Sequence, residues 1–167
     1  MNEKHKYYGK YRGTVINNID LEQRGRILAI IPDVSGLTPS TWAMPCLPIA
    51  GKEMGVYVVP QIGSGVWIEF EQGDSDYPIW TGCFWGSAAE VPKLALAGNP
   101  LSPSIVMQTA LQNTLVISDL PPPLGGIMLK SGASTIIVGT DGIKIIAPKI
   151  EINGLTIINQ GALTVTL

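Results

Sequence analysis

The sequence is poor in charged side chains. Lys, Arg, Asp and Glu together make up 14% of its 167 residues, against about a quarter in an average soluble domain. The 11 basic and 13 acidic residues give a net charge of −2, and the basic residues are not clustered in one run of the sequence. The basic surface typical of a nucleic-acid-binding protein is missing, so we expect no nucleic-acid partner. Much of the surface must instead be uncharged or buried against another chain.

Histidine and cysteine are also scarce, which argues against catalysis and metal binding. The only histidine is His5, in a polar segment where fraying is expected. The block GDSD at Gly73–Asp76 is similar to the nucleophile block of GDS-type esterases, but Ser75 has no nearby base. Cys46 and Cys83 have no metal-site or disulfide spacing and are expected to be reduced thiols in the core.

Several carboxylates near the GDSD block offer a pair for glycoside hydrolysis. Their spacing favours exposed positions of a hairpin and its turn: Glu69, Glu71, Asp74 and Asp76. We therefore expect no catalytic residue, no metal site and no cofactor.

The sequence also lacks a long apolar run. The first residues, MNEKHKYYGKYRG, are polar, and no stretch approaches the 18 apolar residues of a membrane span. We therefore expect neither a signal peptide nor a transmembrane helix. The protein is expected to be made in the cytoplasm and assembled there.

Aromatic residues are absent from the second half of the chain. All of them lie between Tyr7 and Trp85, and the later residues are β-branched and nearly uncharged. A stretch rich in proline and small residues follows Gly86, which is typical of a connection. The sequence thus predicts one domain over residues 1–86, a linker over 87–104 and a second domain over 105–167.

The first segment contains short β-rich runs separated by turn residues, which predicts five or six antiparallel strands. In VWIEFE, Val66, Ile68 and Phe70 alternate with polar or larger side chains, a period of two that buries one face of a strand. A small barrel of the OB type fits this count and length. The predicted strands are Tyr11–Ile16, Arg26–Ile31, Thr41–Leu47, Gly55–Val59, Val66–Glu71 and Tyr77–Phe84, with the last two forming a hairpin.

The second segment repeats very short strands with two or three aliphatic residues on one face. Strands of this length suit a narrow β-helix or β-prism. One aliphatic face has nothing in its own chain to pack against, so we expect three copies to bury it about a common axis. The expected trimer core consists of Ile127, Leu129, Ile143, Ile145, Ile150, Ile152, Leu155 and Ile157.

Two blocks of the first segment resemble the central spike of contractile injection machines. YYGKYRGTVINNIDLEQRGRILAIIPDV is similar to the opening of this family's OB domain, and PQIGSGVWIEFEQGDSDYPIWTGCFWG, at Pro60–Gly86, is similar to its signature. The second block is the more specific, because it keeps the order Trp67, Gly73, Asp74, Pro78 and Trp80. The family comprises phage baseplate assembly protein V and the valine-glycine-repeat spikes of type VI secretion.

The resemblance implies a structural, non-enzymatic spike assembled into a phage tail or tail-like particle. Its OB barrels would dock on a hub or baseplate protein, and its needle would transiently pierce a target cell envelope. Some relatives insert a muramidase between barrel and needle, but the linker of this sequence is too short to hold one. Others close the needle with a histidine iron site, which is not expected here because no histidine follows His5. The resemblance further implies a PAAR-repeat tip protein, bound here by Leu163, Val165 and Leu167.

Two other functions from different classes stay open at this point. One is a cell-wall hydrolase, which the missing catalytic base and the missing insertion oppose. The other is a binding module. An OB barrel trimerised by a β-stalk could bind an oligosaccharide or single-stranded nucleic acid by stacking on aromatic side chains. The tryptophans available for this are Trp42, Trp67, Trp80 and Trp85, although filling the barrel core and contacting a hub is the favoured interpretation.

Overall fold

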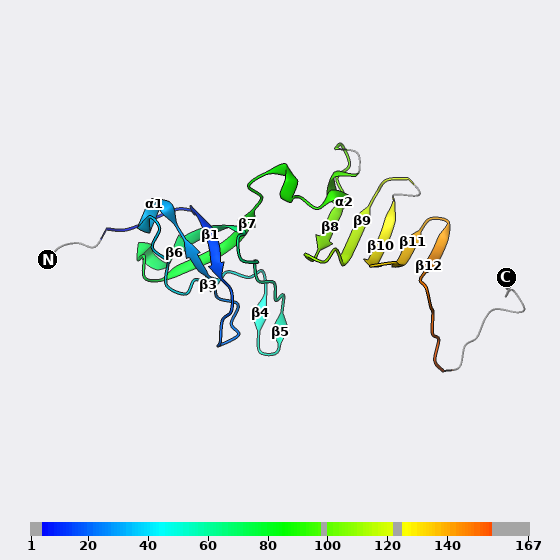
Figure 1. Cartoon of the computed structure of the whole chain (residues 1–167), viewed down its shortest axis with the longest axis horizontal. Helices are drawn as coiled ribbons and strands as arrows, with labels where there is room; N and C mark the ends of the chain where they lie inside the picture. The colour runs from blue at the N-terminus through cyan, green and yellow to red at the C-terminus, as the bar shows by residue number, and fades with distance from the viewer. Residues whose placement is uncertain (1–4, 98–99, 122–124, 155–167) are drawn as a thin grey trace, which may run out of the picture. The chain divides into compact units, whose positions relative to one another are not determined.

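The computed structural model describes residues 5–97, 100–121 and 125–154. The chain divides into two compact units, Met1–Glu90 and Val91–Leu167 (Figure 1). Both are built mainly of strands, and the helices are single turns: α1 (Pro32–Ser35), η1 (Glu71–Gly73), η2 (Ala88–Glu90) and α2 (Lys93–Leu96). The all-β class is therefore confirmed.

The first unit contains a five-stranded sheet with the order β2-β1-β6-β7-β3. Its strands are β1 (Tyr11–Asn17), β2 (Leu28–Ile30), β3 (Met44–Pro45), β6 (Gly65–Phe70) and β7 (Pro78–Phe84). A separate hairpin is formed by β4 (Ala50–Gly51) and β5 (Met54–Gly55). The antiparallel pairing of β6 with β7 confirms the predicted hairpin.

Two details of the predicted barrel are wrong. β3 pairs with β7 in parallel, not antiparallel, because the long segment after Pro45 returns the chain through β6 instead of through a tight turn. The run predicted as a strand at Gly55–Val59 keeps only Gly55 in β5, and residues 56–59 leave the hairpin in an irregular conformation.

The two edges of the sheet meet through isolated backbone bridges. The N–H of Ile27 donates to the carbonyl of Ala43 at 3.2 Å, and the N–H of Ala43 donates back at 2.8 Å. A second bridge joins Ile30 and Pro39. These bridges link the residues around β2 to those just before β3, and they leave less of the sheet edge open to other chains.

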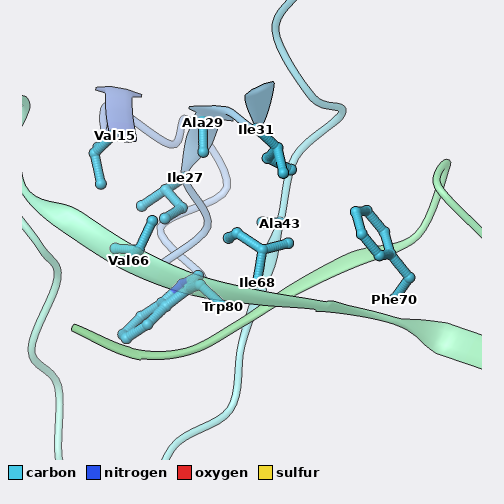
Figure 2. Packing of buried hydrophobic residues seen from close by; sticks show 9 residues of the cluster. All are labelled: Val15, Ile27, Ala29, Ile31, Ala43, Val66, Ile68, Phe70 and Trp80. Atoms are coloured by element: carbon cyan, nitrogen blue, oxygen red, sulfur yellow. The ribbon is translucent and has the colours of Figure 1, made fainter. Parts of the chain in front are cut away.

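The barrel core forms on the inner face of these strands (Figure 2). Val66, Ile68 and Phe70 of β6 are buried and alternate with half-buried residues, as the period of two predicts. Trp80 of β7 joins them, and its indole N–H donates to the carbonyl of Gly25 at 3.0 Å. The other core residues are Val15, Ile27, Ala29, Ile31 and Ala43.

The predicted core thiols are not in the core. Cys46 and Cys83 are both free and both exposed. Cys46 follows the short edge strand β3, and Cys83 lies near the end of β7, where the strand runs past the core residues.

The second unit contains a five-stranded antiparallel sheet in which the strands follow one another in sequence order. Its strands are β8 (Ile105–Gln108), β9 (Thr114–Ser118), β10 (Gly126–Ser131), β11 (Ser134–Gly139) and β12 (Gly142–Ile146). Gly126 is needed at the start of β10, because its φ is +99° and a Cβ there would lie 2.2 Å from the carbonyl oxygen of Val138. Because every strand pairs with the one before it in the sequence, the sheet is an antiparallel meander.

Candidate trimer interface

Strand register places a continuous aliphatic surface on one face of the second sheet. Residues that face each other across antiparallel strands project to the same side of the sheet. The paired positions form two rows that cross all five strands, which we call the aliphatic ladders. One ladder is Ile105, Ile117, Ile127, Val138 and Ile143, and the other is Met107, Leu115, Leu129, Ile136 and Ile145.

The aliphatic ladders are exposed within the single chain. Apart from the half-buried Leu115, their side chains range from 39% exposed at Ile117 to 69% at Ile143. The opposite face is more buried and more mixed in chemistry. Val116 is 8% exposed and Met128 and Ile137 are half-buried, and the face also carries Lys130 and Lys144 and, at its end, the exposed Ile146. An aliphatic surface of this extent on a soluble chain marks an interface.

Four of the expected trimer-core residues lie on the aliphatic ladders: Ile127 and Leu129 of β10, and Ile143 and Ile145 of β12. The structure brings them together across β11, whose Ile136 and Val138 stand between them. Sequence reasoning missed the residues from β8, β9 and β11. The runs IVMQ, TLVIS and STIIVG are short and rich in β-branched or aliphatic residues, which is a signal for strands. Each run has three consecutive apolar residues, so only the strand register shows which of them share a face.

Two other expected core residues, Ile150 and Ile152, are not on this sheet. Ile150 and Ile152 follow β12 in a segment without assigned strand, where they are 53% and 69% exposed. They alternate with Lys149 and Glu151, whose side chains pair with each other. Leu155, Ile157 and the expected tip residues Leu163, Val165 and Leu167 lie outside the described residues.

The tryptophans of the barrel do not form a stacking platform. Trp80 is buried in the core. Trp67 is half-buried and packs against Phe84, with the guanidinium of Arg12 5.4 Å from its ring centre. The guanidinium of Arg26 lies 5.5 Å from the ring of Trp42. Trp85 alone of the four is exposed, at 61%, so the four tryptophans do not supply the successive open rings on which a single strand would stack.

An ion pair that the sequence did not reveal organises the loop between β1 and β2. The side chain of Asp20 is 3% exposed, and its Oδ1 accepts from Arg26 Nη2 at 2.6 Å. Its Oδ2 accepts from Arg26 Nε at 3.1 Å and from the backbone N–H of Arg24 at 2.9 Å. The hydrogen bonds from Arg26 hold the pKa of Asp20 far below its ordinary value.

The carboxylates weighed for catalysis lie on strand β6 and in the β6–β7 turn, where they make local contacts. Glu69 pairs with Lys10 at 2.6 Å on the outer face of β6. In the turn, the N–H of Asp76 donates to Oδ1 of Asp74 at 3.1 Å, and the N–H of Tyr77 donates to the carbonyl of Asp74. Among residues 5–97, 100–121 and 125–154, no cluster of histidine, cysteine and carboxylate side chains is arranged to hold a metal ion.

Over the same described ranges, none of the helices is long and apolar enough to cross a membrane.

Two family models match the chain in the regions that form the two units. Residues 11–85 match the injector OB domain of type VI secretion systems and phage baseplates. Residues 104–164 match the phage baseplate V C-terminal trimerisation domain, which supports a homotrimer. No curated protein sequence matches the chain. The chain belongs to the family of spike proteins found in phage baseplates and type VI secretion systems, a structural family of injection machines.

Proposed function

We propose that the protein is the trimeric spike at the end of a contractile injection machine and that the aliphatic ladders form the core of its needle. The observation that carries this proposal is the exposed aliphatic face within the segment that matches a trimerisation domain. Three copies would bring three such faces together about one axis and remove them from water. Burying an aliphatic side chain stabilises the assembly by about 1.5–3 kcal/mol.

The dimensions of the sheet favour a triangular β-prism for residues 105–146. Its strands have four to six residues, so each is roughly 13–20 Å long at about 3.3 Å per residue. A triangle with sides of this length places each sheet roughly 4–6 Å from its centre, about half of the 10 Å that separates packed sheets. The side chains of three sheets would therefore meet at the axis without a channel.

The needle would grow along the direction in which strands are added. Five strands spaced about 4.8 Å apart make a stack roughly 19 Å long between the first and last strand axes. The segment after β12 begins with Ala147 and Pro148, and proline cannot donate a hydrogen bond to a neighbouring strand. We propose that residues 149–152 leave the sheet of their own chain and pair with a neighbouring copy, with Ile150 and Ile152 facing the axis.

In this proposal the OB barrels attach the spike to a hub protein at the end of the inner tube, and sheath contraction drives the needle into the target envelope. The match of residues 11–85 to an injector OB domain supports the attachment. The spike itself performs no chemistry. Ser75→Ala should therefore leave particle assembly and injection unchanged, and a specific loss of hydrolysis in this variant would contradict a purely structural role.

The location of the chain tests this function directly. A small tag fused before the barrel should appear in particle images at the end of the inner tube, with three copies per particle. A tag found along the sheath, or a particle that assembles and injects without this chain, would overturn the proposal.

We also propose that a small PAAR-repeat protein caps the needle by covering the aliphatic residues expected at its end, namely Leu163, Val165 and Leu167. Deleting residues 163–167 should leave the trimer intact and abolish co-purification of the tip protein. Retention of the tip protein by the shortened spike would contradict this assignment.

A further inference from the structure

Two neighbouring loops of the first unit carry large apolar side chains that the barrel core does not use. One is the β1–β2 loop at residues 18–27, and the other is the arm at residues 46–59 that contains β4 and β5. In Figure 1 both extend from the same side of the barrel, and together they line one hollow. We call this region the loop-and-arm surface. Its exposed apolar residues are Ile19, Leu21, Ile49, Met54, Val56, Tyr57 and Val58.

The β1–β2 loop is held rigidly although its most apolar residue points into solvent. Leu21 is 92% exposed, and the residue before it, Asp20, is the anchor of the buried ion pair with Arg26. The N–H groups of Glu22 and Arg24 donate to the same carboxylate, and Trp80 donates to the carbonyl of Gly25. A loop ordered in this way loses little further conformational entropy when it binds a partner.

The arm is exposed for a different reason. β4 and β5 pair only with each other, and an isolated two-stranded hairpin is marginally stable in water. Met54, Tyr57 and Val58 of the arm are 59%, 68% and 59% exposed. The barrel supports the base of the arm, where Val59 packs against the core, but it leaves these side chains uncovered. A partner that covers the arm would therefore bury these side chains and stabilise the hairpin.

We propose that the loop-and-arm surface is the part of the OB domain that docks on the hub protein of the baseplate, with Leu21 and Tyr57 as its apolar anchors. This inference rests on the proposed function and adds the docking residues to it. The two family matches separate the roles: self-association is assigned to residues 104–164, whereas this surface lies within the injector OB domain at 11–85. Because the segment that matches a trimerisation domain lies elsewhere in the chain, we infer that the occupant is a different protein of the machine.

The charges around the surface specify the partner's chemistry. Glu22, Arg24, Lys52 and Glu53 border the apolar residues, so both signs of charge are present at the rim. An apolar centre with a mixed polar rim is the usual composition of a protein–protein interface. The mixed rim does not match an acidic membrane surface or a nucleic acid, both of which attract clustered basic residues. The partner should present an apolar groove, once for each subunit of the trimer.

Binding of the full-length spike to the purified hub protein of the same particle tests this inference. Leu21→Ser should raise the Kd by about tenfold or more, because a central apolar anchor is lost, while the mass of the trimer stays unchanged. Tyr57→Ser, made separately in the arm, should weaken binding to a similar degree. Leu37→Ser is the matched control, since Leu37 is 85% exposed but follows α1 in another loop, and its Kd should stay within about twofold of the wild type.

The possible outcomes separate this inference from the function on which it rests. If the wild-type trimer binds the hub and both Leu21→Ser and Tyr57→Ser bind equally well, the docking surface lies elsewhere although the spike function stands. If Leu21→Ser dissociates the trimer, the surface is a contact between subunits and the inference is wrong. If the wild-type trimer does not bind the hub at all, both the inference and the proposed attachment fail.

Discussion

At the scale of single residues, the buried carboxylate of Asp20 shows how a polar contact shapes the barrel. It accepts hydrogen bonds from the side chain of Arg26 and from backbone N–H groups of its own loop. An ionised carboxylate is tolerated away from water only when such donors surround it. The pair therefore fixes the path of the chain between β1 and β2.

The depressed pKa of Asp20 makes the stability of the barrel depend on pH. A carboxyl group whose pKa is lowered on folding stabilises the native state above its ordinary pKa, near 3.8, and this stabilisation is lost as the pH falls further. Asp20→Asn should therefore lower the Tm at pH 7, and the difference from the wild type should shrink below about pH 4. Thermal unfolding followed by circular dichroism across this range measures it. An equal difference in Tm at pH 2 and pH 7 would contradict the assignment.

The barrel core makes a second prediction at this scale. Ile68 of β6 is fully buried, so Ile68→Ala should leave a cavity and lower the free energy of unfolding by about 2–5 kcal/mol. Ile62 is 59% exposed, and Ile62→Ala should change it by less than about 0.5 kcal/mol. Urea unfolding of the two variants provides the comparison, and equal losses would contradict the position of the core.

Some residue positions could be predicted from sequence and others could not. The burial of Val66, Ile68 and Phe70 follows from simple alternation, because a strand that covers a core has only two sides. The exposure of Cys46 and Cys83 does not follow from their residue type, since it depends on where each strand runs past the core. Likewise, Asp20 and Arg26 form their pair only once the loop has closed.

At the scale of elements, strand pairing explains what the aliphatic pattern left open. The run STIIVG contains three consecutive β-branched aliphatic residues, so alternation alone does not say which of them share a face. The register with β10 and β12 places Ile136 and Val138 on the face of the ladders and Ile137 on the other. The aliphatic residues of β10 and β12 could be predicted from the sequence. The complete ladders could be identified only from the pairing of all five strands.

Leu129 is the most direct test of the ladders, because Leu115 and Ile136 flank it on the neighbouring strands. Leu129→Asp would place three carboxylates near one axis, and each would cost several kcal/mol in lost hydration. We expect this variant to lose the trimer while the barrel stays folded. Lys130→Asp is the control, since its side chain belongs to the opposite face, and it should keep the trimer mass in analytical ultracentrifugation. Loss of the trimer in both variants, or in neither, would contradict the assigned face.

The segment after β12 carries a separate prediction. If Ile152 faces the axis between neighbouring copies, Ile152→Asp should lower the Tm of the trimer strongly. Glu151→Asp, on the other side of the same segment, keeps a carboxylate that can pair with Lys149 and should have little effect. Differential scanning calorimetry of the two variants checks this, and a trimer with the same Tm in both would mean that residues 149–152 do not pair between chains.

At the scale of the whole molecule, the two units differ in how they bury their apolar side chains. The composition of the sequence changes near Gly86, and the chain divides into two compact units after Glu90. The aromatic half folds around its own buried core, whereas the aliphatic half leaves its ladders exposed in the single chain. The first unit is thus able to bury its apolar side chains alone, and the second needs further copies of itself to do so.

The mass of the purified full-length chain in solution tests the central claim most directly. Light scattering after size exclusion should give about 53 kDa, three times the 17.8 kDa of one chain, at every concentration at which the protein is folded. This result is required if three sets of aliphatic ladders pack about one axis. A folded, soluble species of 17.8 kDa would contradict the account, because it would mean that the aliphatic face is stable in water without a partner.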